Sequence, residues 1–345
     1  MPGLPPALQQ ALSALSSGKG RSTLAQRSSS ITAGYQKRQN SRHILVNGDD
    51  ALAYALARMP ATYAATRRAL LRLAEAAPML APASLLDIGC GPGTASFAAS
   101  DVFADLQAFC LLDRNGPFLD LARTLAPELA AGAPADASID VAAHELSDLQ
   151  PLPKADLVIA GYVLAELDEG LRQALVPRLW EATAKALVLV EPGTPDGFLR
   201  LREARYALIA AGAHVAAPCT HASACPMSGE NWCRFFERVQ RSRDHRMLKG
   251  GTLSFEDEPY AYLAVMREAP AGRPASRIVG RPVVSKVQAQ IPVCGAHGLF
   301  TLSVPSRQKT LFKDFKRLEW GDAVVNPIQE AVAVNQDMRE TVLKS

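Results

Sequence analysis

No apolar run in this 345-residue sequence is long enough to cross a bilayer, so we expect a soluble protein with no membrane partner. Its start, "MPGLPPALQQALSALSSGKG", lacks the basic leader and apolar block of a secretory signal. Six cysteines are too few for a disulfide-stapled secreted scaffold, which would be shorter and denser in cysteine. We therefore expect reduced thiols. With 48% hydrophobic residues, the chain can bury a large core in one or two domains.

Acidic residues are scarce at both ends of the chain. Residues 1–48 contain no Asp or Glu, and between 269 and 318 the one acid is Asp314. The basic residues of these two regions are Lys19, Arg21, Arg27, Lys37, Arg38 and Arg42, then Arg273, Arg277, Arg281, Lys286, Arg307, Lys309, Lys313, Lys316 and Arg317. Basic ends around a balanced middle suggest a polyanion partner, and solvated surface strips explain them equally well. The acid-free, Ser-rich start also fits an organellar transit peptide.

Strand-like and helix-like stretches alternate from residue 49 onward. Helical spacing over 49–77, with a break expected at Pro60, precedes apolar runs that read as strands. These include "ASLLDIG", "AFCLLD", "IDVAAHEL", "ADLVIAG" and "ALVLVEP". Such alternation predicts an α/β fold with a parallel sheet and helices on both faces. We expect a basic N-terminal arm (1–48), a sheet domain (49–268) with a Cys-rich insertion at 214–250, and a basic, β-rich C-terminal lobe and tail (269–345).

The stretch "LLDIGCGPGT" places Gly89, Gly91 and Gly93 between a strand and a helix, where the backbone can approach a ligand closely. The spacing is GxGxG and not the GxGxxG expected for NAD. With Asp87 before the glycines, it resembles class I S-adenosylmethionine-dependent methyltransferases and implies their Rossmann-like sheet and cofactor. Asp113 ends the second strand, where an acid accepts hydrogen bonds from a ribose diol. Asp148 follows the third and is expected to hold an adenine amino group.

Binding that cofactor does not establish methyl transfer. The segment "GYVLAEL" lacks the Asn/Asp-Pro-Pro-aromatic motif of amino-methylating enzymes, and it offers no Pro-Cys nucleophile. Glu166 and Glu191 are the nearest acids, and neither has an obvious role as a base. No catalytic residue is assigned.

Three cysteines lie close together in the segment 214–236. Cys219, Cys225 and Cys233 have the spacing C-x5-C-x7-C, and Cys294 in "IPVCGAHG" is the natural fourth. Four thiolates can hold zinc or an iron–sulfur cluster. The spacing lacks the CxxC knuckle usual in zinc ribbons. Three histidines could nevertheless serve as zinc ligands, so zinc remains an alternative: His221, His245 and His297. Buried free thiols are the alternative. Cys90 and Cys110 are expected to be packing residues.

The Cys-rich segment carries a more specific resemblance. "APCTHASACPMSGENWCRFFERVQRSRDHRMLKGGTLSFEDEPYAYLAV" is similar to the methyltransferase-like family of small-ribosomal-subunit assembly factors, found in mitochondria and bacteria. "ALARMPATYAA", "LDIGCGPGT" and the tail "LFTLSVPSRQKTLFKDFKRLEWGD" match it too. The resemblance implies that Cys219, Cys225, Cys233 and Cys294 ligate a 4Fe-4S cluster. It also implies work on or beside the small-subunit ribosomal RNA during assembly or translation.

Several expectations follow for the whole chain. Because Cys294 lies 61 residues after Cys233, metal ligation would tie the tail to the sheet domain. The basic residues after the third cysteine are expected to face RNA: Arg234, Arg238, Arg241, Arg243, His245, Arg246 and Lys249.

We expect a monomer in a bacterial cytoplasm, with the mitochondrial matrix as the alternative. The competing functions are a methyltransferase acting on a non-RNA substrate and a catalytically silent, iron- or redox-sensing RNA-binding module.

Overall fold

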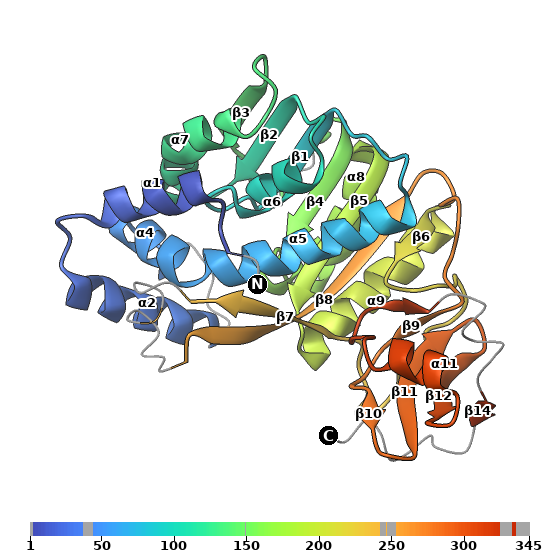
Figure 1. Cartoon of the computed structure of the whole chain (residues 1–345). Coiled ribbons are helices and arrows are strands. Elements are labelled where there is room, and N and C mark those ends of the chain that lie inside the picture. The colour runs from blue at the N-terminus through green and yellow to red at the C-terminus, as the bar shows by residue number, and fades with distance from the viewer. Residues whose placement is uncertain are drawn as a thin grey trace.

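A computed structural model describes residues 3–36, 44–148, 150–241, 246, 253–324 and 333–335 (Figure 1). Six basic residues considered above lie outside this part of the chain: Lys37, Arg38, Arg42, Arg243, His245 and Lys249. Within the described residues, no helix is both long and apolar enough to cross a membrane.

The main sheet has eight strands in the order β3-β2-β1-β4-β5-β8-β6, and β7 pairs with the far half of β8. The strands are β1 (Ser84–Ile88), β2 (Ala108–Asp113), β3 (Ser138–Ala143), β4 (Ala155–Gly161), β5 (Thr183–Pro192), β6 (His214–Ala217), β7 (Phe235–Gln240) and β8 (Phe255–Met266). The first five are mutually parallel, whereas β8 runs antiparallel to β5 and β6. This is the class I methyltransferase-like arrangement, so the predicted fold class is confirmed.

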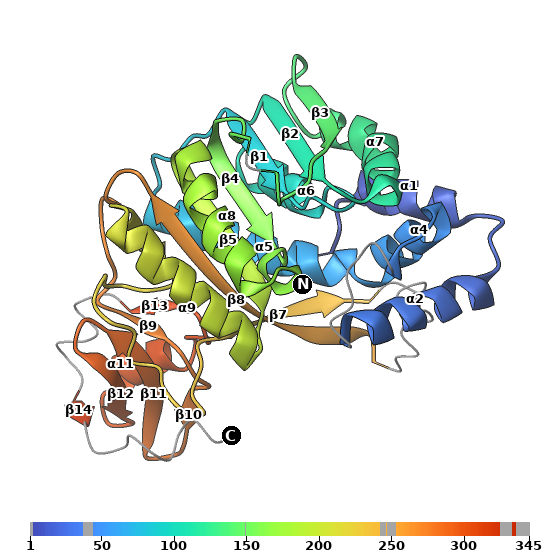
Figure 2. The ribbon, with the colours of Figure 1, turned by 180° about the vertical axis from the view of Figure 1, so that it is seen from behind.

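Helices cover both faces of this sheet. One side carries α5 (Met59–Ala76), α6 (Thr94–Val102) and α7 (Gly116–Ala131), and the other carries α8 (Glu169–Ala182) and α9 (Pro195–Ala210) (Figures 1 and 2). Successive strand residues point to opposite faces. Leu85 therefore belongs to one buried cluster and Leu86 to the other, and both are at most 1% exposed.

The N-terminal region is helical and packed. It forms α1 (Pro6–Ser16), α2 (Arg21–Gln36) and α4 (Gly48–Ala57). Leu8 and Leu12 of α1 are buried in the same cluster as α5 and α7. Asn47 caps α4 and accepts the N–H groups of Asp49 and Asp50. The helix is interrupted at Arg58, which ends α4 and precedes α5. Pro60 lies in the first turn of α5, where a backbone N–H would have no partner within the helix, so its absence costs no hydrogen bond.

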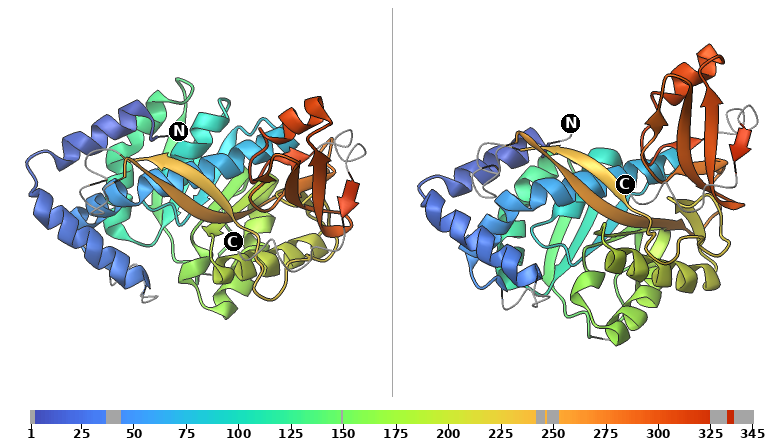
Figure 3. Two further views of the ribbon diagram at one scale, coloured as in Figure 1. Left: turned by 60° about the horizontal axis from the view of Figure 1, so that its bottom comes forward. Right: turned by 90° about the horizontal axis from the view of Figure 1, so that it is seen from below.

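The C-terminal lobe is a separate antiparallel sheet in the order β13-β9-β11-β12-β14, with β10 on β11. Its elements are β9 (Ser276–Ile278), β10 (Val283–Val284), β11 (Gln288–Gly295), β12 (Gly298–Pro305), α11 (Lys309–Phe315), β13 (Ala323–Val324) and β14 (Ala333–Asn335). Figure 3 shows this lobe and the N-terminal helices at opposite ends of the molecule. Buried Arg277 ties the lobe to the Cys-rich segment by donating to the Pro218 carbonyl oxygen at 3.0 Å. Arg72 of α5 pairs with Asp322 at 2.7 Å.

Candidate cofactor pocket and cysteine cavity

A pocket opens at the carboxyl ends of β1, β2 and β4, the edge where open α/β sheets bind ligands. Of the predicted cofactor-binding residues, Asp87, Gly89, Gly91 and Asp113 line it. The loop needs glycine at position 89. Gly89 has φ +64°, and a Cβ there would lie 2.4 Å from a methyl group of Val163.

Asp113 is held in place by the glycine loop. Its two carboxylate oxygens accept the backbone N–H groups of Gly91 and Asn115, each at 2.8 Å. A carboxylate has about four lone-pair sites, so these two hydrogen bonds do not use all of them. This leaves Asp113 able to accept hydrogen bonds from a ribose diol while it fixes the loop.

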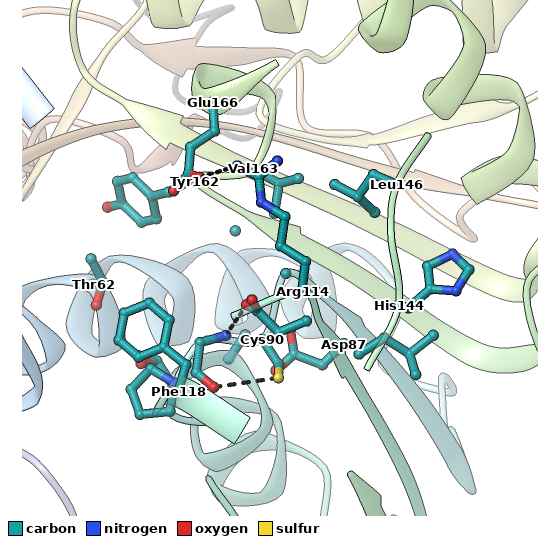
Figure 4. A pocket seen from close by; sticks show the side chains of 18 of the residues that line it. Thr62, Asp87, Cys90, Arg114, Phe118, His144, Leu146, Tyr162, Val163 and Glu166 are labelled. Carbon is teal, nitrogen blue, oxygen red and sulfur yellow. Dashed lines mark hydrogen bonds and ion pairs between the residues drawn. The ribbon is translucent and has the colours of Figure 1, made fainter. Parts of the chain in front are cut away.

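Two buried polar atoms in the pocket have no hydrogen-bond partner among the described residues. They are the Tyr162 hydroxyl and the His144 Nε2 atom. In Figure 4 these side chains lie on opposite sides of Arg114, whose Nη2 reaches Glu166 at 3.3 Å. Tyr162 also has φ +65°, an uncommon conformation for a residue other than glycine. Unsatisfied buried polar groups are costly, and a bound polar ligand would satisfy them.

Two predicted residues lie outside the pocket lining. Gly93 has φ +86° and forms the N-cap of α6, so it shapes the turn and does not line the pocket. Asp148 is exposed and accepts the Gln150 N–H at 3.1 Å, while His144 and Leu146 occupy the pocket edge after β3. Five further residues line the pocket although no sequence motif marks them: Tyr54, Thr62, Phe118, His144 and Tyr162. Tyr162 could have been found, because it directly follows the apolar run of β4.

Asp87 is 1% exposed and accepts hydrogen bonds from the Ser96 backbone N–H and hydroxyl, at 3.1 and 2.8 Å. Burial raises its pKa from 3.8 to about 7, although the two Ser96 hydrogen bonds oppose the shift. Asp87 thus joins β1 to the start of α6. In doing so it places a titratable carboxyl under the pocket floor.

The raised pKa of Asp87 predicts a pH effect on stability. The folded state binds the Asp87 proton more tightly than the unfolded state, so stability falls as pH rises from about 4 to about 7. Asp87→Asn keeps an oxygen for Ser96 and removes the buried charge. We expect the variant to be more stable than the parent at pH 8, by an amount on the order of a few kcal/mol, and equal to it below pH 4. Chemical denaturation at both pH values measures this, and a less stable variant at pH 8 would contradict it.

The four cysteines predicted as metal ligands line a second cavity between the sheet domain and the C-terminal lobe. Cys219, Cys225 and Cys233 come from the segment between β6 and β7, and Cys294 comes from β11. Burial raises the pKa of the Cys233 thiol well above 9, and the other three thiols raise it further. The cavity therefore favours neutral thiols until a cation is present, because thiolates this close repel one another.

Basic and polar groups surround these thiols. Arg205 is 3% exposed, and its Nη2 donates to the carbonyl oxygens of His221 and Ser223 at 2.8 and 2.9 Å. Its Nε and Nη1 atoms and the His221 Nδ1 atom are buried with no partner among the described residues. His221 Nε2 lies 3.7 Å from the Cys294 sulfur. Buried, unsatisfied N–H donors beside four thiols fit an anionic thiolate centre.

The cysteines share a cavity without forming a closed ligand set. Within the described ranges, no group of three or more His, Cys, Asp or Glu side chains is arranged to hold a metal ion. The choice of these four cysteines as ligands therefore stays a prediction. Its support is the shared cavity and the orphaned donors around it. Cys90 is buried in the main core, whereas Cys110 is half-buried on β2, and neither lines the cavity.

Comparison with known proteins bears on the whole chain. Residues 48–325 match the family model described as "Mitochondrial small ribosomal subunit Rsm22". The chain belongs to the Rsm22 family. The match covers the pocket, the cysteine cavity and most of the C-terminal lobe.

Two kinds of curated relative illustrate this family. The human "Ribosome assembly protein METTL17, mitochondrial" is 25% identical over 310 residues, covering 84% of this chain and 66% of that protein. An "Rsm22-cox11 tandem protein" of Schizosaccharomyces pombe, also named mitochondrial, is 25% identical over 328 residues, covering 79% and 42%. This Rsm22 family member thus spans just under two thirds of the human relative and less than half of the yeast one.

Solved structures resemble the sheet domain at low identity. Magnesium protoporphyrin IX methyltransferase from Synechocystis PCC 6803 is 15% identical, with a TM-score of 0.40 and coverage of 60% of this chain and 84% of that one. A putative RNA methyltransferase from Pyrococcus horikoshii is 11% identical, with a TM-score of 0.37 and coverage of 60% and 83%. The strand order β3-β2-β1-β4-β5-β8-β6 defines the fold.

Proposed function

We propose that this protein binds small-subunit ribosomal RNA and assists assembly of the small ribosomal subunit. The observation that carries the proposal is the family match over residues 48–325, which includes the cofactor pocket and the four cysteines. The human relative's name describes a ribosome assembly protein. Both relatives are named as mitochondrial proteins. For this chain, a bacterial cytoplasm remains our prediction.

Sedimentation of the chain from its own cells tests this role. We expect the tagged protein to migrate with small-subunit particles and to leave them at high salt, because phosphate contacts weaken as salt rises. Depletion is expected to lower the ratio of small to large subunits. Migration with large-subunit particles alone, or with no ribosomal particle, would contradict the proposal.

The proposal includes an S-adenosylmethionine site in the pocket above Asp87. Gly89 and Gly91 would let the backbone approach the cofactor, and Asp113 would accept hydrogen bonds from its ribose. His144 and Tyr162 supply unsatisfied polar atoms to the same pocket. The cofactor supplies an activated methyl group when bound. We propose a ribosomal RNA base as the methyl acceptor. We assign no residue to remove a proton from that base.

The proposal also includes a 4Fe-4S cluster in the cysteine cavity, with zinc as the alternative. Cys219, Cys225, Cys233 and Cys294 would be its ligands. Arg205 and Arg277, each 3% exposed, line the same cavity and would offset the negative charge of four thiolates. The cluster would be structural, since it would join the sheet domain to a lobe that follows it in the chain.

The basic residues of the C-terminal lobe give a salt prediction. Lys313, Lys316 and Arg317 are exposed on or just after α11. Replacing all three by Glu is expected to weaken RNA binding uniformly across sequences and to lower the salt slope by about 2, as three lost phosphate contacts require. Titrations at several salt concentrations measure the slope. Lys154→Glu, at an exposed site on the sheet domain, is the control and should leave it unchanged.

A further inference from the structure

The segment "WCRFFERVQ" separates its side chains onto two faces. Phe235, Glu237 and Val239 of β7 are at most 5% exposed and face the interior. The residues at the alternate positions are half-buried or exposed. They alternate between aromatic rings and guanidinium groups: Trp232, Arg234, Phe236 and Arg238. We name the outward group the β7 strip. It consists of Trp232, Arg234, Phe236 and Arg238, with Phe255 and Trp320 beside them.

The rings and guanidinium groups of the β7 strip are in contact with one another. The Arg234 guanidinium carbon lies 4.2 Å from the centroid of the Trp232 ring, and 5.8 Å from those of Phe236 and Trp320. Phe236 and Trp320 meet edge to face, with centroids 5.1 Å apart. Further along, Arg238 lies 4.3 Å from the Phe255 centroid. These contacts form one aromatic and basic surface contributed by β7, β8 and the segment before β13.

The orientation of the strip is fixed by the fold. Trp232 donates its indole N–H to the Gly193 carbonyl oxygen at 3.0 Å, which anchors that ring to the end of β5. Trp320 follows α11 and adjoins Asp322, the partner of Arg72. Because both ends of the strip are held, its side chains would lose little conformational entropy when a ligand stacks on them.

The charges of the strip are unequally balanced. Arg238 is paired with both carboxylate oxygens of Asp257, at 2.7 and 3.0 Å. Arg234 makes no ion pair within the described part of the chain. Burial first, and then the like charge of Arg281, lower the pKa of Arg234. The charge of Arg234 is therefore available to an anion.

We propose that the β7 strip binds unpaired nucleotides of an RNA, stacking bases on Phe236, Trp320 and Trp232 and holding a phosphate at Arg234. Aromatic faces and guanidinium planes are the surfaces on which proteins stack single-stranded bases. Charge favours RNA over an apolar protein segment, because the Arg234 guanidinium lies among the rings without an ion-pair partner in the described part of the chain. The inference rests on the RNA partner of the proposed function, and it names where unpaired bases would bind.

Tryptophan fluorescence with a short, unstructured oligouridylate tests this directly. The chain has three tryptophans, and Trp180 is 5% exposed and hydrogen-bonded to the Ala211 carbonyl oxygen, so its emission should stay constant. We expect the oligonucleotide to quench Trp232 and Trp320, and the same sequence as a duplex to quench them weakly. This measurement uses the unaltered chain and does not depend on a variant folding.

Variants of the strip give the second readout. Phe236→Ser and Trp320→Leu are each expected to weaken oligouridylate binding by about 5- to 150-fold, the range for one lost base stack. Their salt slopes should match that of the parent, because stacking releases no counterions. Met79→Ser, which removes an apolar side chain that is 91% exposed elsewhere, is the control. Thermal unfolding confirms that each variant is folded.

The outcomes separate this inference from the proposed function. Parent-like affinity in both strip variants, or RNA binding without tryptophan quenching, would overturn the β7 strip while leaving RNA binding by the chain intact. Failure of the unaltered chain to bind any small-subunit RNA would overturn the proposed function and the strip with it. Quenching with loss of affinity in the variants supports both.

Discussion

Replacing Cys294 by serine is expected to lower the iron content of anaerobically purified protein from about four atoms per chain to less than one. Cys294 is the ligand contributed by the C-terminal lobe, and the other three come from the segment between β6 and β7. Removing it leaves three thiols and the Arg205 donors, and the C-terminal lobe then contributes no ligand to the cluster. The visible absorbance of the cluster should disappear with the iron.

The effect on the lobe is expected to be partial. Arg277 still donates to the Pro218 carbonyl oxygen, and Arg72 still pairs with Asp322. We therefore expect faster hydrogen exchange in β9 and β11, with the lobe still folded. Cys110→Ser changes a half-buried thiol outside the cavity and should keep full iron content. Full iron in the Cys294 variant would refute it as a ligand, and zinc in place of iron would refute the cluster.

Replacing Gly91 by arginine is expected to abolish detectable binding of S-adenosylmethionine and its demethylated product. A Cβ at position 91 would point toward the Phe118 ring, 3.9 Å away, so a long side chain there would enter the pocket. Gly91 also donates its N–H to Asp113, and φ +53° disfavours any residue with a Cβ. Isothermal titration calorimetry measures the binding.

Gly212→Arg is the matched control for that experiment. Gly212 has φ +83°, and a Cβ there would meet no atom within 4 Å. This control imposes the same kind of backbone strain in the turn after α9, away from the pocket. Lost binding in both variants would indicate general destabilisation. An unchanged dissociation constant in Gly91→Arg would refute the pocket.

Much of the sheet domain could be predicted from sequence, because its signals are local. The apolar runs ending at Asp87 and Asp113 became β1 and β2, and the glycines between strand and helix became the pocket loop. Pro60 marked the break between α4 and α5 through its missing N–H. The basic residues after Cys233 required tertiary information. Pairing with β8 makes residues 235–240 a strand, so Arg234 and Arg238 share a face.

The remaining site residues depend on contacts between distant segments. His144 lines the pocket edge where Asp148 was expected, since the chain turns away from the sheet after β3. Arg205 lies on α9, and no motif marks it. Its position beside the cysteines depends on how α9 packs against the Cys-rich segment. Trp320 joins Phe236 through the docking of the C-terminal lobe, which sequence periodicity cannot predict.

Ultraviolet cross-linking of the native chain in purified small-subunit particles, followed by identification of both peptide and nucleotide, tests the central claim most directly. We expect cross-links from the Trp232–Gln240 segment and the C-terminal lobe to unpaired nucleotides of the small-subunit ribosomal RNA. Cross-links to the large-subunit RNA alone, or none to RNA in a particle that contains the chain, would contradict it.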